Sequence, residues 1–552
     1  MTAPARRAVT AFGDGALVLG VATTAEAHAA AELLRGYVAG GGPPWLGVED
    51  VVVGSRSVTV IADPVAADLD AMAHALARLA PPPATGAPSR VAEVAVVFDG
   101  PDLDEVAALA GLDRGEVIAQ LTRAELDVAF VGFLPGFAYL EGLAPSLARV
   151  PRRRTPRPRV AAGSVALGGG FAGIYPQASP GGWHLVGRTA FRLFDPAHPP
   201  FATLRPGDRV RLRPDDGRGG PLPQPGGTVH DRGGRRGGRG GTIVVEEPGL
   251  LSTVQDLGRI GVAALGVPRA GAACPVELRV GNRLLGNADD APGIEVTARG
   301  PTLRFDGPAH VAVVGAPEAR LDGLRVAPDT VIPVEAGQVL AVGATGGGLR
   351  AYVAVAGGIA EPPVLGSASS DVLTGLGPGP LRRGDVLATG SPGRLRGTMR
   401  RTGPLLPPPA GGPRRVRILA GPDAVAATSL STLSATTWEV TAESDRMGLR
   451  LRGATTVVAP SAGIPSRAVV TGAVQVPADG APVVLLCDHA TVGGYPVVAT
   501  VVSADLGVVG ACRPGDRLRL ELVDLDEARR ARTELELALD RAVTGWYPVR
   551  AG

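Results

Sequence analysis

The sequence of 552 residues contains no lysine, and all 55 of its basic residues are arginine. This absence excludes every chemistry that needs a lysine amine, including P-loop phosphate binding, pyridoxal phosphate and Schiff-base catalysis. Biotin and lipoate are also attached through lysine, so this chain carries neither group covalently. A coding sequence rich in G and C explains the preference for arginine, and the exclusion holds whatever its origin.

Cysteine is equally scarce. The three cysteines, Cys274, Cys487 and Cys512, are far apart and form no CxxC pair, which predicts no disulfide framework and fits a reducing, cytoplasmic location. No apolar run is long enough to predict a transmembrane helix, and Asp14 interrupts the first apolar stretch, which argues against a signal peptide. The seven histidines show no zinc-ligand spacing, so we expect no protein-bound metal site.

The charge balance is nearly neutral, with 55 basic and 53 acidic residues. No global field therefore indicates a nucleic acid or a membrane as the partner. Glycine (79) and proline (51) together make up almost a quarter of the chain, whereas aromatics are only 4%. Because glycine and proline punctuate short strands and turns, the composition disfavours an all-helical protein. Together with the pattern of elements along the chain, we expect an α+β protein that is mainly β.

The first segment predicts a small α+β domain over residues 1–85. Residues 16–21 form a short apolar run typical of a strand, and residues 51–61 are rich in β-branched side chains, as in a strand or hairpin. Residues 25–38 and 69–79 have the apolar spacing of amphipathic helices. This order predicts a split βαβ, ferredoxin-like arrangement.

Shifts in composition divide the rest of the chain. Two stretches of low complexity cannot bury a core and are predicted to be linkers, and the RGG-like pieces of the first are interpreted as solvated, not as an RNA-binding site. The predicted units are a β-rich unit at 86–215, a Gly/Arg/Pro linker at 216–241, a first lobe at 242–392, a linker at 393–414, a second β-barrel lobe at 415–525, and a C-terminal helix and tail at 526–552.

Three signals recur in the same order in the two halves, which predicts two copies of one β-rich fold. They are a Gly-x-Val start, a Gly-x-Tyr-Pro turn and an Arg-Pro-Gly-Asp-Arg turn that leads into a final strand. Their positions are 163–165, 173–176 and 205–209 in the first copy, and 472–474, 493–496 and 513–517 in the second.

One formal motif is rejected. Residues 168–173 match GxGxxG, but Ile174-Tyr175-Pro176 follows directly, so the helix that a dinucleotide-binding turn requires cannot begin there.

Clusters of glycine with polar or aromatic residues remain. Glycine lets backbone N–H groups approach a ligand closely, and arginine can bind a carboxylate or phosphate with two parallel hydrogen bonds. Turns and Arg–Asp pairs that merely hold a barrel together would give the same pattern, so the clusters predict a ligand site only when taken together. The candidates for substrate or ATP binding are Phe133, Pro135, Gly136, Phe137, Tyr139, Gly163, Ser164, Gly181, Gly182, Trp183, Arg188, Thr189, Gln255, Asp256, Arg259, Gln475, Gly494 and Tyr495.

Several of these clusters resemble known families. GFLPGFAYLEGL, GIYPQASPGGWHLVGRT and LRPGDRVRL are similar to the B subunit of 5-oxoprolinase, also called allophanate hydrolase subunit 1. PGLLSTVQDLGRIG, SDRMGLRLRG and TGAVQVPADGAPVVLLCDHATVGGYP are similar to the C subunit of 5-oxoprolinase, which resembles the carboxyltransferase domain of urea carboxylase. The resemblance implies a fusion of the B and C subunits, with cyclophilin-like β-barrels in both halves.

The resemblance further implies ATP-dependent opening of 5-oxoproline to glutamate, performed with a separate A subunit of 5-oxoprolinase and with Mg²⁺ bound to ATP. The candidate catalytic residues are Asp445, Arg446, Asp488 and His489. We expect Arg446, together with Arg188, to contact anionic groups, the two aspartates to bind Mg²⁺ or orient water, and His489 to carry a proton.

Two alternatives stay open. A biotin-dependent carboxyltransferase acting on urea or a related amide would need its biotin carrier on another chain. A non-catalytic inhibitor of a sensor histidine kinase, a role found among relatives of the B subunit, would need a kinase partner and no turnover.

Overall fold

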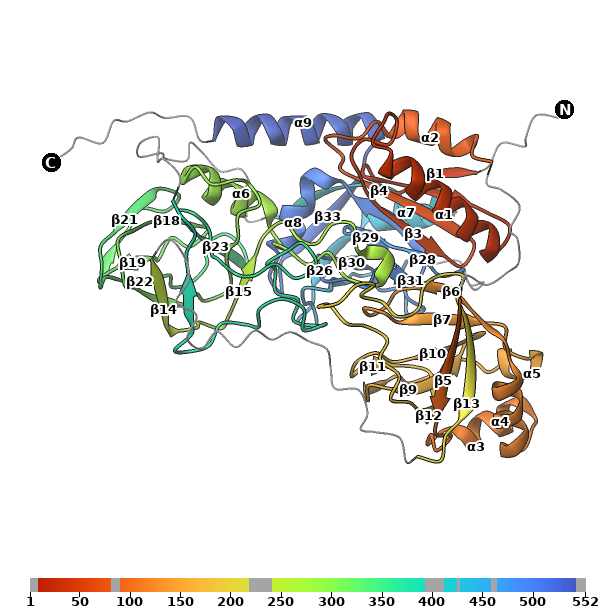
Figure 1. Ribbon diagram of the computed structural model, residues 1–552. Helices are drawn as coiled ribbons and strands as arrows, with labels where there is room; N and C mark the ends of the chain where they lie inside the picture. The colour runs from red at the N-terminus through yellow and green to blue at the C-terminus, as the bar shows by residue number, and fades with distance from the viewer. Residues whose placement is uncertain are drawn as a thin grey trace.

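The computed structural model describes residues 8–80, 90–217, 241–392, 412–423, 427–457 and 464–542 (Figure 1). The predicted boundaries between the units stay a prediction, and the two predicted linkers, like the tail after α9, lie largely outside the described residues. The three cysteines are buried and unpaired. Within the described ranges, no helix has the length and apolar character needed to cross a membrane.

The N-terminal unit is the predicted split βαβ arrangement. Its sheet has the order β1-β2-β4-β3, and β4 lies between β2 and β3, antiparallel to both. The side chains of Thr23 and Asp68 accept hydrogen bonds from backbone N–H groups in the first turns of α1 and α2, so each helix begins at a capping residue. The predicted strand, hairpin and helices are confirmed as β2 (Ala16–Gly20), α1 (Thr24–Ala39), β3 (Val48–Gly54), β4 (Ser57–Ala62) and α2 (Leu69–Ala77). The edge strand β1 (Val9–Ala11) was not predicted.

The next unit is a seven-stranded barrel with the order β12-β9-β10-β7-β6-β13-β5. A single bridge between Val97 and Arg188 links its first and last listed strands and nearly closes it. Its elements are β5 (Val91–Val96), α3 (Leu103–Ala110), α4 (Arg114–Arg123), β6 (Leu126–Val131), β7 (Ala138–Glu141), α5 (Pro145–Ala148), β8 (Arg157–Val160), β9 (Ser164–Gly168), β10 (Phe171–Ile174), β11 (Ser179–Gly181), β12 (His184–Arg188) and β13 (Arg209–Pro214).

The second half begins with a lobe of two sheets around one apolar core. The sheet orders are β20-β19-β22-β17-β14-β24 and β15-β16-β23-β18-β21, and α6 packs on the second sheet through β18 and β23. The elements are β14 (Thr242–Glu247), β15 (Leu251–Gln255), η1 (Ala263–Leu265), α6 (Pro275–Leu284), β16 (Gly293–Thr297), β17 (Thr302–Phe305), β18 (Ala309–Val314), β19 (Arg320–Leu321), β20 (Leu324–Arg325), β21 (Val331–Val334), β22 (Val339–Ala341), β23 (Arg350–Val355) and β24 (Val386–Ala388).

The last unit is a closed barrel with the order β25-β32-β29-β30-β27-β26-β33. Its connectivity repeats that of the first barrel, and in both the last strand pairs in parallel with the first. Its elements are β25 (Arg414–Ala420), α7 (Ala427–Ala435), β26 (Thr437–Val440), β27 (Gly448–Arg452), β28 (Arg467–Ala468), β29 (Ala473–Gln475), β30 (Val483–Leu485), β31 (Val492–Gly493), β32 (Val497–Val501), η2 (Ser503–Asp505), α8 (Leu506–Gly510) and β33 (Arg517–Leu522).

The repeated Arg-Pro-Gly-Asp-Arg turn has the same function in both barrels. Asp208 forms an ion pair with Arg90, which precedes the first strand, at 2.9 Å, and Asp516 forms the equivalent pair with Arg414 at 3.1 Å. Each aspartate therefore closes its turn and ties the last strand to the first, and the predicted duplication is confirmed.

The predicted pairing of the Gly-x-Tyr-Pro turns is wrong. Residues 173–176 begin at the end of β10 and precede β11, whereas residues 493–496 begin at the end of β31. By topology, the counterpart of Gly493-Gly494-Tyr495 is Gly181-Gly182-Trp183. The two tetrapeptides share letters because glycine and proline recur wherever these strands turn.

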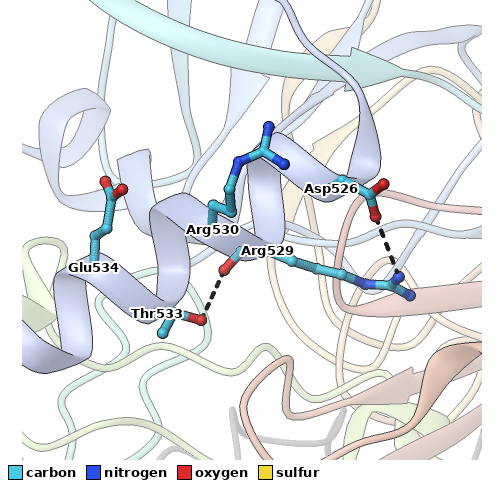
Figure 2. A pocket seen from close by; sticks show the side chains of 5 residues that line it. All are labelled: Asp526, Arg529, Arg530, Thr533 and Glu534. Carbon is cyan, nitrogen blue, oxygen red and sulfur yellow. Dashed lines mark hydrogen bonds and ion pairs between the residues drawn. The ribbon is translucent and has the colours of Figure 1, made fainter.

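Helix α9 (Leu525–Arg541) lies across both halves of the molecule (Figure 1). Arg529 forms an ion pair with Asp70 of the N-terminal unit at 3.0 Å, and Glu536 accepts two hydrogen bonds from Arg279 of α6 at 2.7 and 2.8 Å. The opposite face of α9 is exposed: Figure 2 shows Arg530 and Glu534 without a partner among the residues drawn, around a shallow hollow. The helix therefore acts as a strap that is anchored on one face.

We expect the Glu536→Gln substitution to loosen this strap, because it removes one charge from a two-pronged Arg–carboxylate pair that is less than a quarter exposed. The loss should be about 1–2 kcal/mol of local stability, or roughly tenfold faster amide exchange in α9. Hydrogen–deuterium exchange measures this directly. The matched control is Glu534→Gln on the exposed face, and equal exchange in both variants would contradict the assignment.

Candidate functional site

A cleft of about 700 Å³ lies where four parts of the chain meet. The N-terminal unit, the two-sheet lobe, the second barrel and α9 all contribute to its wall. The polar side chains in its lining are Asp14, Glu49, Asp50, Asp63, Asp256, Arg259, Arg269, Arg279, Asp289, Asp290, Thr471, His489, Thr491, Thr500, Ser503, Arg532 and Glu536. The cleft thus combines residues separated by more than 400 positions in sequence.

Asp50 joins the two halves at the edge of this cleft. Its carboxylate accepts hydrogen bonds from the backbone N–H groups of Gly261 and Ala263, at 3.0 and 3.1 Å, just ahead of and within η1. The neighbouring Glu49 pairs with Arg269 at 2.6 Å. Burial raises the pKa of Asp50 to about 6 even though the two N–H groups oppose that shift.

Arg259 crosses from the lobe into the wall of the cleft and is only 2% exposed. Its Nε donates to the carbonyl of Val364 at 3.1 Å and its Nη2 donates to the carbonyl of Ser369. Its Nη1 is buried without a protein partner. Since a buried donor without an acceptor is unfavourable, this atom is suited to a ligand oxygen.

The loop that holds Arg259 is fixed by Asp256. The Asp256 carboxylate accepts hydrogen bonds from the Ser367 hydroxyl and from the backbone N–H groups of Gly258 and Ala368, at 2.6–2.8 Å. Gly258 has φ +92°, and a Cβ there would lie 2.7 Å from the Arg269 carbonyl oxygen. Glycine is therefore required for the turn that directs Arg259 inward.

Arg446 binds the second barrel to the lobe. Its guanidinium donates to both carboxylate oxygens of Asp488, at 2.8 and 3.0 Å, and also to the carboxylate of Glu295. It also donates to the carbonyl of Gly271 at 2.6 Å. Four of its five N–H groups thus donate to acceptors of the protein itself, and these hydrogen bonds form a structural joint between the barrel and the lobe.

Glu295 remains ionised in this joint. Burial raises the pKa of its carboxyl group, but the charges of Arg446 and Arg350 outweigh burial and hold that pKa below its ordinary value. The Tyr352 hydroxyl donates to Glu295 at 2.7 Å, and so does the backbone N–H of Ala273 at 2.8 Å. Every charged or polar side chain named in this buried network therefore has a charge partner or a hydrogen bond.

A second buried carboxyl group, Asp371, adjoins the network. It accepts hydrogen bonds from the backbone N–H groups of Leu373 and Thr374, both at 3.1 Å. Burial, and then the negative charge of Asp488, raise the pKa of Asp371 to about 6. Near pH 6 this group can therefore exchange a proton.

His489 follows Asp488 directly and lines the cleft. Its Nδ1 lies 2.7 Å from the carbonyl oxygen of Ala490, which can only accept, so Nδ1 carries the proton and Nε2 carries a lone pair. Burial lowers the pKa of His489, which favours the neutral ring near pH 7. The cleft thus contains a histidine held in the form of a base.

Further polar atoms in the wall of the cleft lack partners within the described protein. These are the hydroxyls of Thr491 and Thr500 and the Nε of Arg532, in addition to Nη1 of Arg259. Hydroxyls can both donate and accept, so the set suits a small polar ligand with carbonyl and carboxylate oxygens. No group of three His, Cys, Asp or Glu side chains in the described ranges is placed to hold a metal ion.

The aromatic loop of the first barrel is packed, not open. Phe137 contacts Phe133, Tyr175 and Trp183 edge to face, with ring centroids 5.3–5.6 Å apart. Burial raises the pKa of Tyr139 in the same cluster to about 12. The loop meets the second half through Gly136, whose N–H donates to the carbonyl of Leu265 at 2.8 Å.

The structure brings together only part of the predicted site. Asp256, Arg259 and His489 line the cleft, while Arg446, Asp488 and Gln255 are buried and bonded within the protein. Asp445 is exposed and accepts from the N–H groups of two following residues in a turn. The other predicted residues do not line the cleft: Phe133, Pro135, Gly136, Phe137, Tyr139, Gly163, Ser164, Gly181, Gly182, Trp183, Arg188, Thr189, Gln475, Gly494 and Tyr495.

Sequence reasoning missed Asp50, Thr491 and Thr500. Thr491 stands beside the predicted Asp488-His489 pair and could have been included on that ground. Asp50 lies inside β3 and Thr500 lies inside β32, and no local pattern separates them from ordinary strand residues.

The chain matches two family models. Residues 7–204 match "Carboxyltransferase domain, subdomain C and D", and residues 265–522 match "Carboxyltransferase domain, subdomain A and B". The order of the two blocks parallels the two halves described above.

Relatives of each half are established proteins. The chain is 35% identical to the C subunit of 5-oxoprolinase from Haemophilus influenzae over 52% of this chain and 94% of that protein. It is 43% identical to the B subunit of 5-oxoprolinase from Escherichia coli O157:H7 over 30% of this chain and 78% of that protein. It is also 30% identical to urea amidolyase of Lachancea kluyveri, over 54% of this chain but 18% of that protein.

One solved structure spans nearly the whole chain. The crystal structure of TTHA0988 aligns with a TM-score of 0.81 and 34% identity, covering 92% of this chain and 99% of the other. The full architecture, with both barrels and the lobe, therefore occurs as one unit in another protein.

The Asp50→Asn substitution should change how stability depends on pH. Because the folded-state pKa of Asp50 is raised from 3.8 to about 6, the wild type loses stability relative to the variant as pH rises through that interval. Thermal melts of both proteins from pH 4 to pH 7 measure the difference, which should be flat above about pH 6. A difference that grows in the opposite direction would contradict this assignment.

The Arg446→Ala substitution should destabilise the protein severely, by about 3–5 kcal/mol, since it leaves Glu295 and Asp488 charged and unpaired in the interior. Chemical denaturation followed by tryptophan fluorescence provides the measurement. Arg450→Ala, an exposed arginine on the next strand, is the control and should change stability by less than about 0.5 kcal/mol. Combining Arg446→Met with Glu295→Gln and Asp488→Asn should recover much of the loss.

Proposed function

Since the two halves of the chain belong to the B-subunit family and the C-subunit family of 5-oxoprolinase, joined in one polypeptide, we propose that it is a component of an ATP-dependent 5-oxoprolinase. In this proposal it opens 5-oxoproline to glutamate together with a separate A subunit. The substrates are the cyclic amide and the Mg²⁺ complex of ATP.

The observation that carries the proposal is coverage of both subunits by one chain. The likeness extends over 94% of one C subunit of 5-oxoprolinase and 78% of one B subunit, so most of the length of each subunit is represented in this chain. The cleft lies where elements of both halves meet, as expected if the two subunits act as one body.

The chemistry requires activation, because a lactam is a stabilised amide. Transfer of the γ-phosphoryl group of ATP to the lactam oxygen, with ADP leaving, would make the ring carbon susceptible to water. Water addition and cleavage of the ring C–N bond open the ring, and a second water releases phosphate to leave glutamate. Without lysine, the developing charge must be stabilised by arginine, backbone N–H groups and the Mg²⁺ that accompanies ATP.

Two residues of the cleft suit this reaction. Nη1 of Arg259 is a buried donor available for the substrate carboxylate or the transferring phosphoryl group. Nε2 of His489 carries a lone pair that can take a proton from the attacking water. In this proposal Arg446 and Asp488 position these two groups by holding the lobe and the barrel together.

The test is ADP release that depends on 5-oxoproline, measured with this chain and the A subunit of 5-oxoprolinase from the same organism. Glutamate formed in step with ADP, and unaffected by avidin, supports the proposal. No turnover, although the A subunit is shown to bind, would refute it for this substrate.

His489→Gln should lower this turnover by about 10²- to 10⁴-fold, because glutamine can hydrogen-bond but cannot serve as a base at neutral pH. His74→Gln, on the exposed face of α2, is the control and should retain full activity. A His489→Gln variant as active as this control would remove His489 from the mechanism.

A second candidate is a carboxyltransferase that receives CO₂ from carboxybiotin on another chain. The observation that favours it is the likeness to urea amidolyase over 54% of this chain. Activity towards urea or a related amide that needs a biotinylated partner and is abolished by avidin would select this candidate.

A further inference from the structure

The first barrel carries a dense basic segment that the cleft does not use. Residues 149–159 contain six arginines and no acidic residue. Four of them, Arg149, Arg152, Arg154 and Arg159, are not fully buried, and none has an ion-pair partner among the described residues. The other two, Arg153 and Arg157, are largely buried, with side chains 26% exposed.

These two arginines are held by one carboxylate. Asp102, which precedes α3, accepts from Arg157 at 2.6 Å and from Arg153 at 3.2 Å through the same oxygen. Its other oxygen accepts from the backbone N–H of Leu185 at 2.7 Å. Although burial raises the pKa of Asp102, the hydrogen bonds from Arg157 and Leu185 prevail and lower it, so the carboxylate stays charged.

The arrangement leaves several buried nitrogens without a protein acceptor. Nε of Arg153 and Nη1 of Arg157 have no hydrogen-bond partner, and neither ring nitrogen of His184 has one. His184, at the start of β12, is only 2% exposed. Its Nδ1 lies 3.6 Å from the carboxylate of Glu105, which also pairs with Arg153 at 2.9 Å. Each such unpaired buried donor is unfavourable, and an oxyanion would supply the missing acceptors.

Backbone contacts also hold the arginine segment in place beside His184. The N–H of Arg153 donates to the carbonyl of Gly182 at 2.8 Å, which fixes the arginine segment against the Gly-Gly-Trp turn. A Cβ on Gly169 would lie 3.3 Å from Nε of Arg152, so the glycine turn between β9 and β10 lies directly beside the arginines. The second barrel has no counterpart in its sequence, because its equivalent strand β28 follows a segment of different composition.

We propose that Arg153, Arg157 and His184 form a binding site for a phosphate-class oxyanion on the first barrel, separate from the cleft. The charge supports an anion: six arginines against Asp102 and Glu105 leave a local excess of four positive charges. Arginine pairs oriented by a carboxylate match the oxygens of a phosphate, and the outer arginines attract it from solution. The phosphate can be free or part of a nucleotide, and the proposal does not depend on the proposed function.

The test is calorimetric titration of the full chain with inorganic phosphate, ADP, ATP and, as a probe without phosphate, adenosine. We expect phosphate to bind, and the binding to weaken at least about tenfold in Arg157→Lys and His184→Gln. Arg152→Ala combined with Arg154→Ala and Arg159→Ala changes only the outer arginines and should weaken binding and its dependence on salt. Arg56→Ala, an exposed arginine of the N-terminal unit, is the control and should bind like the wild type.

The outcomes are distinct. In the first outcome, the variants lose affinity for phosphate, and the wild type binds phosphate and ATP equally tightly. This would identify free phosphate as the ligand. The same loss with tighter wild-type binding of ATP would identify the phosphates of a nucleotide. No phosphate binding by the wild type up to about 10 mM, or unchanged affinity in both Arg157→Lys and His184→Gln, would overturn the proposal. Turnover of 5-oxoproline does not enter this readout, so either proposal can fail alone.

Discussion

The position of the cleft depends on one buried cation. Arg446 reaches from the second barrel to Glu295 of the lobe while it holds Asp488, the residue before His489. Two buried carboxylates would repel each other without it, and the lobe and barrel could not meet at this distance. Its hydrogen bonds therefore determine where His489 stands relative to Arg259. Arginine is a residue type that often binds ligand anions, but the guanidinium of Arg446 binds two carboxylates of the protein instead.

The two barrels show how one scaffold supports different loops. Both have the same strand order, and in both an aspartate of the final turn pairs with an arginine at the first strand. The loop between the second and third strands differs: in the first barrel it carries Phe133 and Phe137 into an aromatic cluster, and in the second it carries Arg446 into an ionic one. Strand pairing constrains the scaffold, whereas the loops are free to take up either kind of contact.

Much of the fold could be predicted because its signals are local. The helices over 24–39 and 69–77 and the hairpin over 48–62 follow from apolar periodicity and capping residues, and the duplication follows from a turn whose aspartate has the same contact in both copies. The mistaken match of 173–176 with 493–496 also has a local cause. Turn residues recur at many strand ends, and only strand order distinguishes one turn from another.

The sequence by itself determined the class of fold, the family and the exclusion of lysine chemistry, since composition, periodicity and long motifs are properties of contiguous residues. It also indicated Arg259, Asp256 and His489, which stand in such motifs. Only the tertiary structure decided that the carboxylate of Asp50 accepts a hydrogen bond from Gly261, 211 positions away, and that the guanidinium of Arg446 pairs with Glu295. The burial and the charge partners of a side chain depend on which distant surfaces meet in the fold. They determine whether an arginine forms an internal ion pair or stays available to bind a ligand.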